Sequence, residues 1–279
     1  MIFYEVKNIK YLVRNMNIKI YRSTNHEIHY LMSYIGGCME VMSFIYLYKA
    51  LIGFMTSNMV FGITSLVKFN FDFESVYHIL IIVIWVLISA IHQVIEYKYI
   101  SKIKSQWHVY AISLTLNCFL MITFILLGNY MIVNNLFLSH PTINVMPLVT
   151  IGLVFMYIQN FIIKNGGTKF PTSTSVVTSV YILMITKLCQ SLLINKSKEK
   201  TNLKFESLHY FLVILHFFIG AFITAILNKY IGFYALVVPL VILIAFCVKI
   251  WSLHISQSSW YRSSEHYCDE VKWECYITV

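Results

Sequence analysis

Long apolar runs alternate with short polar stretches along most of this chain. Six runs approach or exceed the roughly 20 residues that a helix needs to cross about 30 Å of hydrocarbon. They cover residues 31–52, 76–96, 109–132, 146–164, 208–228 and 231–252. None shows the period-two alternation of a membrane β-barrel strand. The pattern predicts an all-α, polytopic helical bundle.

Two further apolar segments are short and rich in hydroxyl side chains. The segment at 54–68 contains Thr56, Ser57 and Asn58, and the segment at 171–190 contains Thr178 and Ser179 among others. Discontinuous helices of this kind occur where membrane transporters bind their substrates. We therefore expect each segment to form a broken or re-entrant helix.

Lysines are distributed unevenly between the loops. If neither short segment adds a net crossing, the lysine-rich loops at 97–107 and 187–207 lie on the side of the basic residues 1–30. The loop at 133–145, without Lys or Arg, then lies on the other side. Because cytoplasmic loops carry an excess of Lys and Arg, this predicts six net crossings with both termini in the cytoplasm.

This topology divides the chain into three parts. We expect a basic cytoplasmic lead over 1–30, a transmembrane domain over 31–252 and a cytoplasmic tail over 253–279. We expect this multi-pass protein to reside in the cell (inner) membrane.

Composition agrees with a membrane protein and excludes a water-soluble globule. The 279 residues are 58% hydrophobic and only 12% charged, with a mean hydropathy of +0.70. The formal charge of +9 is spread over loops and tails beside the spans. Anionic lipid headgroups are therefore the expected partner of the basic residues, rather than nucleic acid.

The order of a broken segment followed by two spans occurs twice, over 31–132 and 146–252. Glu40 is followed sixteen residues later by Thr56-Ser57, and Asn160 is followed eighteen residues later by Thr178-Ser179. Three crossings in each half would make the halves inverted relative to each other, as in many secondary transporters. The sequence thus predicts two inverted three-span repeats.

Two motifs mark the same positions: a glycine pair ahead of an acid, and a glutamine-asparagine pair. They read Gly36-Gly37-Cys38-Met39-Glu40 with Met55-Thr56-Ser57-Asn58 and Gly62, and Gln159-Asn160 with Gly166-Gly167 and Thr178-Ser179. This pattern resembles the YoaK family, bacterial multi-pass membrane proteins with a domain of unknown function. The resemblance covers about residues 31 to 250 and implies an architecture, not an activity. Glu40 stands where that family usually has Asp, and Ser57 and Ser179 stand where it has Gly.

Glu40 is the main functional candidate. On a helix it shares one face with Ser33, Gly36, Gly37 and Ser43, a face that must point into the bundle. One interpretation is a carboxyl that only joins neighbouring helices by hydrogen bonds. The other is a coupling carboxylate or cation site, because a carboxyl removed from water can take up and release protons.

The other candidates surround the two broken helices. Thr56 offers a hydroxyl that suits a helix cap, and an uncapped helix start at membrane depth would favour an anionic group. Asn160 is the neutral counterpart of Glu40, and His216 with His92 suggests a proton relay, against the alternative that both only pack. The proposed substrate- or ion-binding residues are Glu40, Thr56, Asn58, Gln159, Asn160, Thr178 and His216.

Catalytic signatures are absent from the sequence. It has no phosphate-binding glycine loop, no His-Glu-x-x-His and no nucleophile elbow, so we expect no enzyme, no cofactor and no catalytic metal. The Cys268, Cys275, His266 and Asp269 group matches no zinc spacing. Pro239 is expected to kink the sixth span.

These features predict a transporter or channel for a small solute, with proton or cation coupling through Glu40. The alternative is a non-transporting sensor or assembly module whose broken helices only pack. Homo-oligomers are compatible with either.

Overall fold

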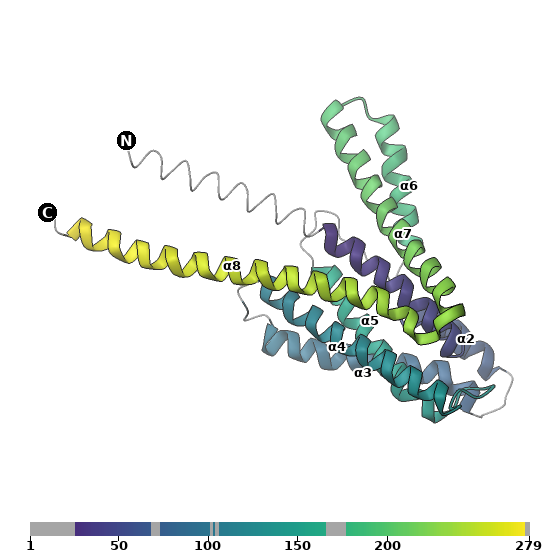
Figure 1. Ribbon diagram of the computed structural model, residues 1–279. Helices are drawn as coiled ribbons and strands as arrows, with labels where there is room; N and C mark the ends of the chain where they lie inside the picture. The colour runs from purple at the N-terminus through teal and green to yellow at the C-terminus, as the bar shows by residue number, and fades with distance from the viewer. Residues whose placement is uncertain (1–25, 68–72, 101–102, 104–105, 166–176, 277–279) are drawn as a thin grey trace.

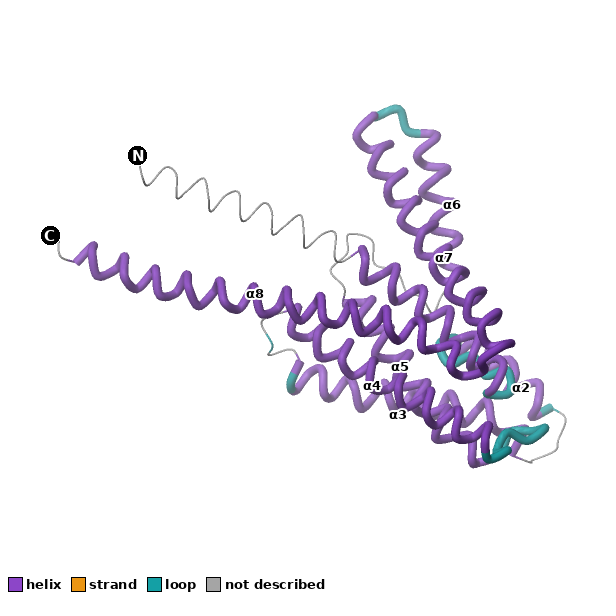
Figure 2. The backbone as a smooth tube through the Cα atoms, in the orientation of Figure 1, coloured by secondary structure: helices purple, strands orange, loops and turns teal. Residues whose placement is uncertain are grey.

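Helices account for all regular structure in the described part of the chain. The computed structural model describes residues 26–67, 73–100, 103, 106–165 and 177–276, and Figure 2 draws the loops between its helices in teal. The first described helix covers 26–46 and is here called the Glu40 helix. The others are α2 (Met55–Leu66), α3 (Phe73–Lys98), α4 (Gln106–Val133), α5 (Met146–Asn165), α6 (Val177–Leu193), α7 (Ser197–Ile231) and α8 (Val237–Tyr276), with the 3-10 turns η2 (Ile143–Val145) and η3 (Gly232–Leu236).

Several helices are long and apolar enough to cross a membrane. The candidate spans are Val76–Lys98, Trp107–Val133, Ile143–Lys164 and the stretch Ser197–Ser256, which contains α7 and the first half of α8. Large apolar side chains also cover the outer face of α3, where Val86 is 58% and Ile91 62% exposed. Water disfavours such a surface and lipid accommodates it. The chain is thus a helical membrane protein.

The Glu40 helix runs parallel to α7. Ser33 Oγ donates to the backbone oxygen of Val213 at 2.6 Å, and Cys38 Sγ lies 3.5 Å from that of Gly220, so both helices advance in the same direction. They approach closely because each presents a glycine: a Cβ at Gly37 would clash with the backbone of α7, and one at Gly220 with the backbone oxygen of Tyr34. Small residues commonly allow such contacts between membrane helices.

Helix α3 runs parallel to α5 in the same way. The rings of Trp85 and Tyr157 lie 5.4 Å apart, and those of His92 and Phe161 lie 4.5 Å apart. The residue numbers of the contacting residues rise together in α3 and α5, so the two helices run in the same direction. These aromatic contacts lie on one side of an otherwise lipid-exposed helix.

Helices α4 and α8 are antiparallel. His108 Nδ1 and His254 Nε2 lie 3.1 Å apart, and Thr115 Oγ1 lies 3.3 Å from Cys247 Sγ. Residue numbers rise in α4 as they fall in α8, and Figure 1 shows the two helices side by side.

The α6–α7 hairpin corrects the expected basic loop at 187–207. That stretch is helical on both sides of a short turn at 194–196, and the hairpin projects from the bundle as the green arm of Figure 1. A helix that leaves the bilayer continues with charged residues, so falling hydropathy marks the end of the apolar span but not of the helix. Helix α7 is therefore much longer than the predicted 208–228.

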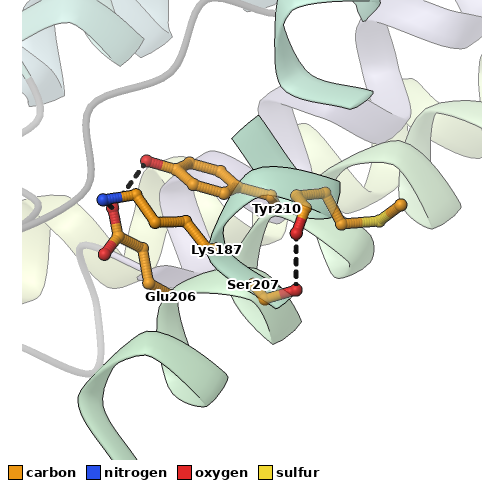
Figure 3. A network of polar contacts seen from close by, with 5 residues as sticks. Lys187, Glu206, Ser207 and Tyr210 are labelled. Carbon is orange, nitrogen blue, oxygen red and sulfur yellow. Dashed lines mark hydrogen bonds and ion pairs between the residues drawn. The ribbon is translucent and has the colours of Figure 1, made fainter. Parts of the chain in front are cut away.

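Polar contacts join the two helices of the arm (Figure 3). Lys187 Nζ lies 3.2 Å from Glu206 Oε1, and the hydroxyl of Tyr210 donates to the same oxygen at 3.2 Å. Ser207 Oγ donates to the backbone oxygen of Met184 at 2.9 Å. The arm is held by its own contacts as well as by its connection to the bundle.

Pro239 does not kink the last helix. Helix α8 begins at Val237, so Pro239 lies in the first turn, where backbone N–H groups have no partner within the helix and proline is tolerated. The helix then continues to Tyr276, well beyond the predicted end of the span at 252.

Candidate functional site

An eight-residue break between the Glu40 helix and α2 forms the centre of the site. The Glu40 helix ends at 46, earlier than the predicted 52, and α2 begins at Met55. Tyr48 and Lys49 have φ values of +51° and +63°, a left-handed conformation that non-glycine residues seldom adopt. Two such residues in succession require support from the surroundings, and three side chains supply it through hydrogen bonds to the break.

Glu40 binds the end of the break. Its carboxyl group is buried, with the residue only 4% exposed, and Oε1 accepts a hydrogen bond from the backbone N–H of Gly53 at 2.5 Å. A Cβ at Gly53 would clash with that oxygen and with the methyl group of Met156, so any other residue would displace both side-chain ends. Oε2 is also buried and has no hydrogen-bond partner among the described residues.

Asn58 binds the middle of the break with both ends of its amide. Nδ2 donates to the backbone oxygen of Leu51 at 2.7 Å, and Oδ1 accepts from the N–H of the same residue at 3.3 Å. His78 Nδ1 lies 3.1 Å from Oδ1, and because an amide oxygen only accepts, that nitrogen carries the proton. Asn58 is thus fully used in holding the backbone.

Tyrosines bind the start of the break. The hydroxyl of Tyr77 in α3 donates to the backbone oxygen of Leu47 at 3.0 Å, and that of Tyr48 donates to the oxygen of Leu138 at 3.0 Å. The break is therefore tied to α2, to α3 and to the connection that follows α4.

Replacing Tyr77 by Phe tests how much one of these bonds contributes. The Tyr77→Phe variant should lose about 1 kcal/mol of unfolding free energy, because the buried oxygen of Leu47 loses one of its two donors while the N–H of Ala50 and the ring remain in place. The measurement is thermal unfolding of the purified protein in detergent. Tyr234→Phe, which changes a largely exposed side chain, should leave the unfolding midpoint unchanged, and equal midpoints for the two variants would contradict the assigned role.

Gln159 joins α5 to the Glu40 helix on the same face as the carboxyl. Its Nε2 donates to the backbone oxygen of Met32 at 2.6 Å, and Gly36 provides the space, because a Cβ there would lie 2.7 Å from that nitrogen. The side chain is completely buried, and Oε1 has no hydrogen-bond partner in the part of the chain that the structure describes. Gln159 and Glu40 are thus both at the interface between these helices.

The remaining predicted residues lie apart from this centre. Thr56 is exposed and does not cap α2, whose N-cap is Phe54 without a side-chain hydrogen bond. The capping prediction was wrong because the helix begins two residues earlier than a cap at Thr56 requires. Thr178 is exposed at the start of α6. His216 contacts its own helix through the oxygen of Leu212 at 2.7 Å.

Among the described residues, no contact joins Glu40, His216 and His92, the members of the proposed proton relay. His216 stacks on Tyr30 with ring centroids 5.1 Å apart, whereas His92 lies 3.9 Å from Glu96 at the far end of α3. Both histidines are better explained by packing than by proton transfer from Glu40.

In the second predicted repeat, the structure describes only some of the residues that correspond to Glu40 and the first broken segment. Asn160 is half-buried on α5, but Gly166-Gly167 and residues 171–176 of the second broken segment lie outside the described residues, as do 1–25 of the basic lead and the side chains of the His266 and Cys268 group. Within the described side chains, no three or more His, Cys, Asp or Glu residues are arranged to hold a metal ion.

Sequence reasoning missed three members of the site. Gly53 acts through its backbone N–H and Tyr77 donates to a backbone oxygen, and a sequence carries no local signal for either contact. Asn117 lies in α4 with its amide fully buried, and the signal that marks it is the same one that marked Glu40, a polar residue within an apolar run.

Comparison with known proteins identifies a family. Residues 28–249 match the family model described as "Protein of unknown function (DUF1275)". No curated protein and no solved structure matches the chain. The match covers most of the chain, including the break, Glu40 and Gln159, and agrees with the YoaK resemblance. The chain belongs to the DUF1275 family.

Proposed function

We propose that this chain is an inner-membrane transporter or channel for a small solute, built from two inverted halves and coupled to protons or a cation through Glu40. Its six crossings would be the Glu40 helix, α3, α4, α5, α7 and α8. The proposal has three parts, concerning the repeat, the orientation and the carboxyl group, and each has its own support.

Helix directions support the inverted repeat. The proposed inverted repeat relates the Glu40 helix to α5, and α3 to α7. If the Glu40 helix and α7 run parallel, their counterparts α5 and α3 must then run parallel as well. Both pairs run parallel, as the Ser33–Val213 bond and the Trp85–Tyr157 contact indicate. The antiparallel pair of α4 and α8 would then lie on the symmetry axis.

The short helices fit the same scheme. Helix α2 would pack on α3 as α6 packs on α7, and neither would add a crossing. The two differ in placement, since α2 lies at the end of the bundle and α6 in the projecting arm (Figure 1). The halves are therefore alike in topology and unequal in shape.

Lysines support the orientation. The connection between α3 and α4 and the turn of the arm both carry lysines, whereas the connection after α4 has none. The positive-inside rule then places the arm and both termini in the cytoplasm. Anionic headgroups at that surface would attract the lysines of the arm.

The buried carboxyl group of Glu40 is the observation that carries the transport proposal. A carboxyl at membrane depth is costly unless it is used, and only one of its oxygens is needed to hold the break, through Gly53. The second oxygen remains for a proton, a cation or a polar solute. The neighbouring break supplies the irregular backbone that membrane transporters use at their binding sites.

Glu40→Gln tests the coupling in proteoliposomes. The amide keeps an oxygen for the N–H of Gly53 but has no charge, so solute flux should lose its dependence on an imposed proton or sodium gradient. Glu74→Gln, which neutralises an exposed carboxylate in the first turn of α3, should keep that dependence. Gradient-dependent flux that persists in Glu40→Gln would remove the coupling role.

A non-transporting sensor or assembly module is the alternative, and Asn58 favours it. The amide binds the backbone of Leu51 with both of its ends and also contacts the ring of His78 in α3, as expected of a structural element. This alternative predicts no flux of any solute in a broad screen, with a folded protein and, where it assembles, a homo-oligomer. Neither reading assigns an enzymatic activity to the chain.

A further inference from the structure

Three buried polar side chains lack partners for some of their polar atoms. Asn117 and Gln159 are completely buried and Glu40 is 4% exposed. Among the described residues, both polar atoms of Asn117, Oε1 of Gln159 and Oε2 of Glu40 make no hydrogen bond. Buried polar groups in native proteins are nearly always satisfied, so three such groups in one region indicate a ligand.

Register places Asn117 opposite Gln159. Helices α4 and α5 are successive, antiparallel neighbours, and a Cβ at Gly152 would lie 3.2 Å from the ring of Phe124. Asn117 precedes Phe124 by seven residues and Gln159 follows Gly152 by seven. Seven residues are about two helical turns, so both amides lie on the facing sides of the two helices and at the same level.

Gln159 is also related in space to Glu40, through Gly36 on the Glu40 helix. It lies against Gly36, and Glu40 follows Gly36 by four residues, one turn along the same face. Met156, one turn before Gln159, lies beside Gly53, the residue that Glu40 binds. Asn117 and Gln159 thus lie at one level of the bundle, and Glu40 lies about one helical turn further along the Glu40 helix.

The polar atoms without a hydrogen-bond partner indicate the chemistry of the ligand. Three oxygens, one of them from a carboxyl group, face a single donor group, the Nδ2 of Asn117. An anion would be repelled and an apolar group would satisfy none of these atoms. Carboxylate and amide oxygens are ligands for hard cations, and one carboxylate balances one positive charge.

We infer that Asn117, Gln159 and Glu40 bind a small monovalent cation, either an alkali metal ion or ammonium. The inference rests on the proposed function, because it names the ion that Glu40 couples. It adds Asn117 to the site and gives Gln159 a role beyond its bond to Met32. Ammonium would donate hydrogen bonds to the three oxygens, and a metal ion would be coordinated by them.

Thermal unfolding of the purified full-length chain tests the site without requiring transport. At constant ionic strength, choline chloride is replaced by sodium, potassium or ammonium chloride, since choline is too large for a buried site. At least one of these salts should raise the unfolding midpoint of the wild type with saturation, because a ligand that binds only the folded state stabilises it. The responding ion distinguishes a metal cation from ammonium.

Asn117→Leu should require an about tenfold higher concentration of that ion for half of the effect, because one oxygen is lost. Glu40→Gln is the second variant, with the carboxylate charge removed and the shape kept, and should abolish the response. Asn129→Leu is the matched control, since the Asn129 amide donates to Ile125 of its own helix and has no other hydrogen bond among the described residues, and it should respond as the wild type does.

Equal midpoints in all four salts would overturn the cation site, as would an unchanged response in both Asn117→Leu and Glu40→Gln. Gradient-dependent flux without any salt effect would likewise overturn the site while leaving the transport proposal in place. Cation stabilisation without flux of any solute would support the site and remove transport.

Discussion

Gly37→Ala and Gly220→Ala should each destabilise the protein by about 3 kcal/mol, at the upper end of the cost of overpacking. A Cβ at Gly37 would clash with the backbone oxygen of Phe217, and one at Gly220 with that of Tyr34. Backbone atoms of packed helices cannot rotate away, as a side chain can. The Glu40 helix and α7 must therefore separate, which also breaks the Ser33–Val213 bond.

The measurement is the unfolding midpoint of the purified variants in detergent, with the monodisperse fraction as a second readout. Gly152→Ala is the matched control, because its nearest neighbour is the terminal methyl group of Ile52 at 3.0 Å, which can move. We expect a clearly smaller loss for this control. A Gly37→Ala or Gly220→Ala protein that unfolds like the wild type would show that the two helices do not pack as closely as the structure has them.

Asn58→Leu should cost about 3 kcal/mol, because it removes three hydrogen bonds at once. The N–H of Leu51 and the Nδ1 of His78 lose their partner, and the oxygen of Leu51 keeps only the N–H of Phe54. Leucine has the same number and branching of side-chain heavy atoms and is not smaller, so the loss reports hydrogen bonding and not a cavity. The break should also open more often, since its left-handed residues Tyr48 and Lys49 lose support.

Thermal unfolding measures the first effect, and hydrogen exchange at residues 50–54 measures the second. Thr64→Ala provides the control within the same helix, because the Thr64 hydroxyl binds only the carbonyls of its own turn, those of Val60 and Phe61. Its midpoint and exchange should remain close to wild type. Unchanged exchange in Asn58→Leu would mean that the break is held by other contacts.

Hydrophobic periodicity and the length of the apolar run predict the helices well where residues facing lipid and residues facing neighbouring helices are both apolar. Helices α3, α4 and α5 match their predicted runs within a few residues. Prediction fails at the ends of α7 and α8, because charged residues end an apolar run without ending a helix. The break at 47–54 was partly hidden for the opposite reason: its residues are almost all apolar, and its geometry depends on hydrogen bonds from distant side chains.

The candidate site shows the same division. Glu40, Asn58 and Gln159 stand out in the sequence because a polar residue in an apolar run requires a reason. Their partners do not stand out, since Gly53 and Leu51 contribute backbone groups that every residue has. Thr56, Thr178 and His216 share the polar signal, yet they lie on other faces or bind their own helix.

The sequence by itself determined that this is a helical membrane protein with a carboxyl inside its apolar region, because hydropathy and residue spacing are local properties. Only the tertiary structure decided that Glu40 binds Gly53, that the Glu40 helix runs parallel to α7, and that Gln159 binds the backbone of Met32. These features depend on the register between helices far apart in the chain, and register is set by the summed packing of many side chains, glycine contacts above all.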